Sequence, residues 1–179
     1  MRGLLIGRFQ PFHNGHLAAV ARLRRDRPDE ALVLGIGSAQ ASFTTDNPFT
    51  AGERHEMISR ALAEAELVGC LPIPVPDIDR HAMWVAYVES LLPPFRRVYT
   101  NNALTRLLFE RAGYAVESPA LVERDRFEGT RVRAALASGG DWRSLVPPSV
   151  GAYLEEIGAP GRVHLLMTTA DGPRKSADR

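Results

Sequence analysis

Short apolar runs alternate with amphipathic stretches along most of the chain. Runs typical of buried strands cover residues 3–6, 31–36, 70–75, 96–100 and 114–116. Apolar residues recur at helical spacing over residues 15–25, 50–66, 80–92, 102–112, 130–137 and 149–157. This alternation predicts an α/β fold, a Rossmann-like doubly wound parallel sheet with helices on both faces and further helices at the C-terminus.

Local signals place the ends and edges of several of these elements. Thr50, followed three residues later by Glu53, forms a capping box that starts the second helix. Pro72 and Pro74 push the third strand toward a sheet edge, because proline cannot donate a hydrogen bond to a ladder. Residues 37–47 are rich in Ser, Thr, Gly and Asn and are expected to form a loop.

The length of 179 residues fits a single domain that can fold without disulfides or a structural metal. We expect the α/β domain to cover residues 1–157. Residues 158–179 are expected to form a C-terminal helix and a polar tail, which either belong to the same domain or fray.

Composition and charge exclude several classes of function. The formal net charge of +1 gives no general attraction to nucleic acid or to an anionic membrane. No segment approaches the ~18 continuous apolar residues of a spanning helix, and a signal-peptide pattern is missing, so we expect a cytoplasmic protein. Cys70 is the sole cysteine, which excludes an intramolecular disulfide and a cysteine-rich zinc site.

The first strand-to-helix connection, residues 7–16, is the first candidate site, because open parallel sheets bind ligands beyond the carboxyl ends of their strands. Gly15 lets the backbone pass close to a ligand, and the helix that starts there offers free N–H groups to an anion. His13 and His16 project from one face of that helix start. Arg8 adds a permanent cation suited to phosphate.

A metal site at the two histidines is the alternative to an anion site. A zinc site would have to borrow His55, His81 or distant acids, because Asp, Glu and Cys are missing nearby. We therefore predict no protein-held metal at this connection.

A second segment with phosphate-binding chemistry starts the helix at residues 130–137. Thr130 can cap that helix or bind a phosphate, and Gly129 permits close approach. Arg133 lies one turn further on, on nearly the same side as Thr130.

These motifs carry a family resemblance. The residues His13-Asn14-Gly15-His16 resemble the HxGH signature of the nucleotidyltransferase superfamily related to class I aminoacyl-tRNA synthetases. The string GRFQPFHNGHL resembles the archaeal-type nicotinamide-nucleotide adenylyltransferases, and GTRVR resembles the distal motif of the superfamily. The resemblance implies catalytic roles for His13, His16 and Arg133. It implies ATP or phosphate binding by Arg8, Phe9, Gly15, Gly129 and Thr130.

The middle of the chain extends this resemblance to an acceptor site. The strings GIGSAQ and NPFTAGER are similar to strings of the same family. The resemblance implies that Trp84 stacks on the nicotinamide ring, a cation–π contact of ~0.5–2 kcal/mol, and that Asn102 binds nicotinamide mononucleotide. Without the resemblance, Trp84 fits a core aromatic residue of an amphipathic helix.

The chain departs from its relatives at three places. Some relatives carry a basic residue where this chain has Asp46, and a histidine where it has Phe43. Asp46 is expected to point away from the phosphates or to assist Mg²⁺. The family's Ser-Gly-Asn is here Thr100-Asn101-Asn102, which keeps the amide but loses the glycine.

The resemblance implies a reaction in which the phosphate of nicotinamide mononucleotide attacks ATP, giving NAD and pyrophosphate with Mg²⁺ as cofactor. It also suggests a ring-like homo-oligomer. The same chemistry on nicotinate mononucleotide, phosphopantetheine or a cytidylyl-transfer substrate stays open, as does a non-catalytic nucleotide sensor. We expect ATP and nicotinamide mononucleotide as partners, with no nucleic acid and no membrane.

Overall fold

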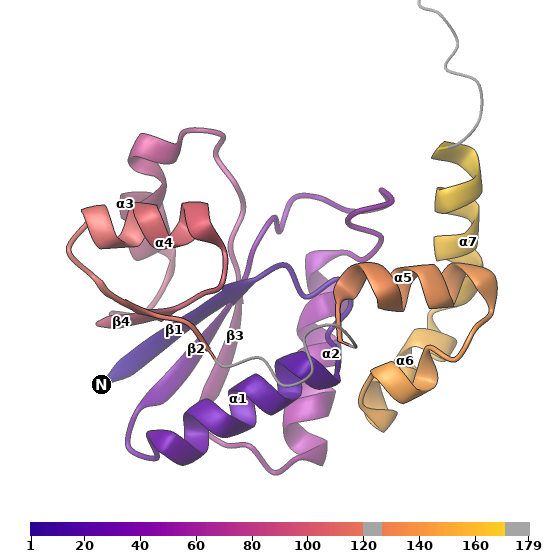
Figure 1. The fold of residues 1–179 in the computed structure, drawn as a ribbon, viewed down its shortest axis with the longest axis horizontal. Helices are drawn as coiled ribbons and strands as arrows, with labels where there is room; N and C mark the ends of the chain where they lie inside the picture. Colours follow the sequence, from indigo (N-terminus) through magenta and orange to yellow (C-terminus); the bar gives the residue numbers. More distant parts are fainter. Residues whose placement is uncertain (120–126, 171–179) are drawn as a thin grey trace, which may run out of the picture.

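The computed structural model describes residues 1–119 and 127–170. Its centre is a five-stranded parallel sheet of order β3-β2-β1-β4-β5 (Figure 1). The strands are β1 (Arg2–Gly7), β2 (Ala31–Ile36), β3 (Cys70–Pro74), β4 (Arg97–Tyr99) and β5 (Ala115–Glu117). The parallel α/β fold predicted from the sequence is confirmed, and the strand with two prolines lies at an edge of the sheet.

Helices cover both faces of the sheet. They are α1 (Asn14–Asp26), α2 (Ala51–Glu64), α3 (His81–Leu91), α4 (Ala103–Arg111), α5 (Gly129–Ser138), α6 (Pro148–Glu156) and α7 (Ala159–Ala170), with a 3₁₀ turn at Arg143–Leu145. Figure 1 shows α1 and α2 on one side of the strands and α3 and α4 on the other, while α5, α6 and α7 form a group beside α2.

Alternate residues of the inner strands supply the two cores. Leu5 and Leu34 face one way and pack with α1 and α2, whereas Leu4 and Val33 face the other way and pack with α3 and α4. All four are buried, as expected of strands covered on both faces.

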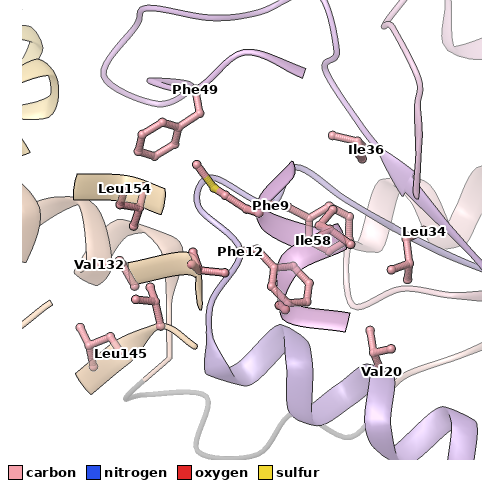
Figure 2. Close-up of a cluster of buried hydrophobic side chains, with 14 of the residues drawn as sticks. Phe9, Phe12, Val20, Leu34, Ile36, Phe49, Ile58, Val132, Leu145 and Leu154 are labelled. Carbon is pink, nitrogen blue, oxygen red and sulfur yellow. The ribbon is translucent and has the colours of Figure 1, made fainter. Parts of the chain in front are cut away.

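The larger core also joins the first loop to the C-terminal helices. Figure 2 shows Phe9 and Phe12 of that loop in one cluster with Val132 of α5 and Leu154 of α6. Ala159 and Val163 of α7 are buried in the same cluster. The apolar contacts therefore fix α5 and its neighbours against the loop that follows β1.

Among the described residues, no helix is long and apolar enough to cross a membrane.

Candidate active site

His13 and His16 bind each other at the start of α1. His13 is the N-cap residue, and its Nδ1 accepts a hydrogen bond from the backbone N–H of His16 at 3.4 Å. The Nδ1 atom of His16 in turn accepts from the backbone N–H of His13 at 3.3 Å. The rings stack with centroids 3.5 Å apart. The pair thus forms a capping box made of imidazoles, which locks both side chains in place.

Both imidazoles are held neutral by their surroundings. Burial lowers the pKa of His13 to about 4. Burial and, after it, the charge of His13 lower the pKa of His16 well below its ordinary value. Because Nδ1 of each ring accepts a hydrogen bond, the single proton of each neutral ring lies on Nε2. The helix start therefore presents paired Nε2–H donors without adding charge.

Gly15 and Phe9 complete the turn around these rings. A Cβ on Gly15 would lie 2.8 Å from the Cβ of Phe127 and 3.3 Å from the ring of His13, so only glycine fits without a shift. Phe9 is buried, and its ring meets that of His16 edge-on at 4.9 Å. Its side chain therefore packs against the histidine and is closed to a ligand.

Arg133 is brought to the same loop from the far end of the sequence. Its Nη1 donates to the carbonyl oxygen of Gln10 at 3.0 Å, and its Nη2 donates to Thr130 Oγ1 at 3.4 Å. A Cβ on Gly129 would lie 3.2 Å from that same carbonyl oxygen. The small residue therefore allows α5 to approach the first loop closely enough for the arginine bond.

Thr130 does not cap α5, contrary to one of the two roles expected from the sequence. The N-cap residue is Glu128, whose side chain makes no capping hydrogen bond. The helix starts earlier than expected because Gly129 already adopts helical backbone. Thr130 is its second residue and accepts a hydrogen bond from Arg133 instead.

Arg8 and Arg54 add positive charge next to Arg133. Burial and then the charge of Arg8 lower the pKa of Arg133, and the same two causes lower that of Arg54 to about 10. Arg8 is exposed to solvent. The guanidinium groups therefore lie close enough to repel one another, which favours an anionic ligand between them.

Arg54 is a structural residue of the site for which no role could be predicted from the sequence motifs alone. It is fully buried, and its guanidinium donates to the carbonyl oxygens of Arg8 at 2.8 Å and Gly37 at 2.7 Å. These carbonyls follow β1 and β2, so one side chain ties the carboxyl ends of both strands together. The sequence held one signal for this role: Arg54 is a cation in the first turn of α2, where the helix dipole disfavours positive charge.

Gln10 is the second residue that the sequence did not single out. Its buried side-chain amide donates to the carbonyl oxygen of Phe49 and accepts from the N–H of Phe49, both at 3.0 Å. Since its own carbonyl holds Arg133, Gln10 joins three segments of the site. A lone glutamine in a loop gives no pattern from which this could be predicted.

A cavity of about 460 Å³ opens beside this cluster, between the strand ends and the helices α3 and α4. It is lined by backbone and side chains of Ile6, Gly7, Arg8, Gly37, Ser38, Asp77, Asp79, His81, Trp84, Asn102, Leu104, Thr105 and Leu108. Arg8 belongs to the cavity and acts electrostatically on Arg133, so it connects the two halves of the site.

Trp84 and Asn102 both reach this cavity. Trp84 is half-buried, and its ring meets Phe109 edge-on at 5.5 Å while also lining the cavity. It is therefore anchored in the smaller core without being enclosed by it. Asn102 caps α4 by accepting from the N–H of Thr105 at 2.9 Å, which fixes its amide at the cavity wall.

Asp46 turns toward Arg133, contrary to the first of its two expected roles, and the second, assistance to Mg²⁺, stays a prediction. Its Oδ1 lies 3.5 Å from Nη2 of Arg133. The side chain of Arg133 is 5% exposed and that of Asp46 is 73% exposed. The buried cation attracts the carboxylate.

The described residues contain no group of three or more His, Cys, Asp or Glu side chains placed to hold a metal ion. Their donor set fits an ion that is bound mainly by ligand phosphates and water, with at most a carboxylate such as Asp46 nearby.

The chain is similar in sequence to one protein family and to several named enzymes. Residues 4–135 match the family described as cytidylyltransferase-like. The chain is 45% identical over 166 residues to the nicotinamide-nucleotide adenylyltransferase of Picrophilus torridus, covering 93% of this chain and 97% of that protein. It is 50% identical over 157 residues to the protein of the same name from Haloarcula marismortui, covering 88% and 82%.

Solved structures share the fold. A bifunctional NMN adenylyltransferase/ADP ribose pyrophosphatase from Francisella tularensis, crystallised with AMP and a Mn ion, is similar with a TM-score of 0.73 at 18% identity. The match covers 93% of this chain and 52% of that one, so the chain spans about half the length of that structure.

Proposed function

Because the chain belongs to the cytidylyltransferase-like family, and within it to the nicotinamide-nucleotide adenylyltransferases, we propose that it transfers the adenylyl group of ATP to nicotinamide mononucleotide. The products are NAD and pyrophosphate. The observation that carries this proposal is the position of Arg8, which lines the Trp84 cavity and lies close enough to act on Arg133 of the phosphate cluster.

The reaction is an in-line displacement at the α-phosphorus of ATP. An oxygen of the mononucleotide 5′-phosphate forms a bond to that phosphorus, and the bond from phosphorus to the oxygen bridging toward the β-phosphate breaks. The electron pair leaves with pyrophosphate. Since the attacking phosphate is already an anion, no general base is required, and catalysis rests on positioning and on charge stabilisation.

His13 and His16 act as neutral hydrogen-bond donors to the phosphoryl oxygens. Their stacked rings are held by the capping box, so the Nε2–H groups need no reorganisation as charge develops. The positive charge comes from Arg8 and Arg133, and the free N–H groups at the start of α1 add to it. Thr130 accepts a hydrogen bond from Arg133, and Gly129 allows α5 to approach the first loop, so both residues position Arg133.

The cavity between α3 and α4 takes the acceptor. Trp84 presents an indole face for the cationic pyridinium ring, a contact worth ~0.5–2 kcal/mol, and Asn102 offers its amide at the opposite helix. Asp77 and Asp79 also line the cavity. Their carboxylates favour a ring with a neutral carboxamide over the acid, whose carboxylate they repel.

Mg²⁺ is the metal we propose to accompany ATP, where it supplies charge neutralisation on the phosphate oxygens. Within the described residues, Asp46 is the carboxylate that lies beside Arg133. It is therefore the residue that would interact with the ion, directly or through water.

One assay tests the proposed function. The chain is incubated with ATP and, separately, nicotinamide mononucleotide, nicotinate mononucleotide or phosphopantetheine, while pyrophosphate and the dinucleotide products are followed. We expect NAD from the first acceptor, slower turnover with the nicotinate acceptor and none with phosphopantetheine. Tight ATP binding without turnover on any acceptor would identify a nucleotide sensor and overturn the proposal.

The homo-oligomer and the cytoplasmic location stay predictions. Light scattering of the purified chain tests the first: a mass of at least twice 19.7 kDa is expected, and a monomer contradicts it.

A further inference from the structure

We infer that Asp46 makes the phosphate site select ATP that carries a divalent cation over ATP that is metal-free. This inference rests on the proposed function only in taking ATP as the ligand. It concerns which form of ATP the free chain binds, and therefore goes beyond the transfer reaction itself.

The Asp46 carboxylate lies beside a buried arginine of the phosphate cluster. Arg133 is almost wholly buried, whereas Asp46 is largely exposed and lies 3.5 Å from Nη2 of that arginine. The other amino group of Arg133 is already bonded to the carbonyl oxygen of Gln10. The remaining amino group donates to Thr130 Oγ1 and lies beside Asp46, so an anion bound to it would lie close to the Asp46 carboxylate.

Neighbouring contacts hold Asp46 in this position. The backbone N–H of Thr44 donates to the carbonyl oxygen of Asn47 at 3.2 Å, and the N–H of Asn47 donates to Thr44 Oγ1 at 3.0 Å. This small turn encloses Asp46. Phe49, just beyond the turn, is clamped by the buried amide of Gln10. The backbone at Asp46 is thus held within a hydrogen-bonded turn.

The α7 helix secures the same loop from outside. Arg162 pairs with Glu53 at 2.8 Å and lies over the ring of Phe43 at 5.0 Å. Both contacts flank the turn that carries Asp46, so the turn is packed against α7.

A carboxylate at this point discriminates between two forms of one ligand. Metal-free ATP brings its full negative charge toward Asp46, and the like charges repel. A divalent cation on the phosphate oxygens removes much of that charge and offers the carboxylate an attractive partner, directly or through water. Arg133 attracts both forms, but Asp46 opposes only the first.

The experiment is an equilibrium binding titration by calorimetry, with the full chain and no acceptor. ATP is titrated in excess EDTA and again in excess Mg²⁺, into the parent chain and into Asp46→Asn. For Asp46→Asn we expect metal-free ATP to bind about three- to five-fold more tightly, with magnesium-bound ATP changing by less than about two-fold, as fits one exposed ion pair. In about 1 M salt the gain should nearly vanish, because the Debye length falls to ~3 Å.

Asp29→Asn is the matched control. It removes one exposed carboxylate from the loop between α1 and β2, at the opposite end of the strands, and should change neither affinity. Equal gains for both forms of ATP in Asp46→Asn would overturn the inference, as would no change in the ratio of the two affinities. If the parent chain binds ATP in neither condition, the proposed function itself fails, which separates the two failures.

Discussion

The two halves of the site are built in opposite ways. On the phosphate side, His13 and Arg133 are buried and bonded to other parts of the site before any ligand arrives. On the acceptor side, Asp77, Asp79 and His81 are exposed, and Trp84 is half-buried in an open cavity. The half assigned to bond making and breaking is rigid, while the half assigned to recognition is accessible. Changes on the phosphate side should therefore affect turnover, and changes on the acceptor side should affect substrate preference.

The largest effect is expected from His16→Ala. Removing one fixed donor to the developing charge should lower kcat by about 10²–10³-fold, while the Kd for ATP changes by less than about five-fold. Steady-state kinetics with calorimetric ATP binding measures both. His55→Ala, on α2, is the control and should leave kcat unchanged. Equal losses in kcat and ATP affinity would mean that His16 only binds the ligand.

The buried, neutral state of His13 should make stability depend on pH. The folded chain holds the pKa of His13 at about 4, below the unfolded value of 6.5. As the pH falls, His13 is therefore protonated in the unfolded chain before it is protonated in the folded chain. The contribution of His13 to the free energy of unfolding is fully present above pH ~6.5 and is lost progressively toward pH ~4. The loss from this residue is of the order of 3 kcal/mol.

Urea unfolding at several pH values, on the parent chain and on His13→Asn, tests this loss. Asparagine also caps helices well, so it keeps the helix start and removes the titration. The parent should lose more free energy of unfolding than the variant between about pH 7 and pH 4. Parallel pH profiles for the two chains would show that His13 is not held neutral by folding.

On the acceptor side, Trp84→Leu should raise the KM for nicotinamide mononucleotide by about 2- to 30-fold, the factor that corresponds to ~0.5–2 kcal/mol. ATP affinity should stay the same because Trp84 lines only the acceptor cavity. Trp84→Phe retains an aromatic face and should recover part of the loss. A drop in kcat with an unchanged KM would break the proposed division between the two halves.

The smallest effect is expected from Asp79→Asn. It should shift the ratio of kcat/KM for nicotinate over nicotinamide mononucleotide upward by about two- to five-fold, since an exposed charge is screened by solvent. Asp79 has a backbone φ of 51°, which asparagine tolerates well, so the backbone should be preserved. An unchanged ratio would remove Asp79 from acceptor selection.

Much of this arrangement could be predicted from the sequence because it is encoded locally. The period of apolar residues gave the strands and most helices, and the Thr50–Glu53 capping box is present in the structure. The spacing of His13 and His16 predicted a shared helix face, and the structure brings them into ring contact. Each of these features depends on residues only a few positions apart.

Features that depend on distant partners could not be predicted in the same way. Gln10 bonds to Phe49 and Arg133, and Arg54 bonds to carbonyls after two strands, so both roles exist only once the sheet has formed. Asp46 was expected to point away from the phosphates or to assist Mg²⁺, and its contact with Arg133 could not be predicted because that residue lies 87 positions along the chain. The site roles assigned to individual residues remain predictions for the experiments above.

The central claim is that the phosphate side works through neutral imidazoles with their protons on Nε2. Long-range proton–nitrogen NMR correlation of the labelled chain at neutral pH reads this state directly, with the rings assigned by His13→Asn and His16→Ala. The account predicts a protonated Nε2 and an unprotonated Nδ1 for both residues. Doubly protonated rings, or protons on Nδ1, would contradict it.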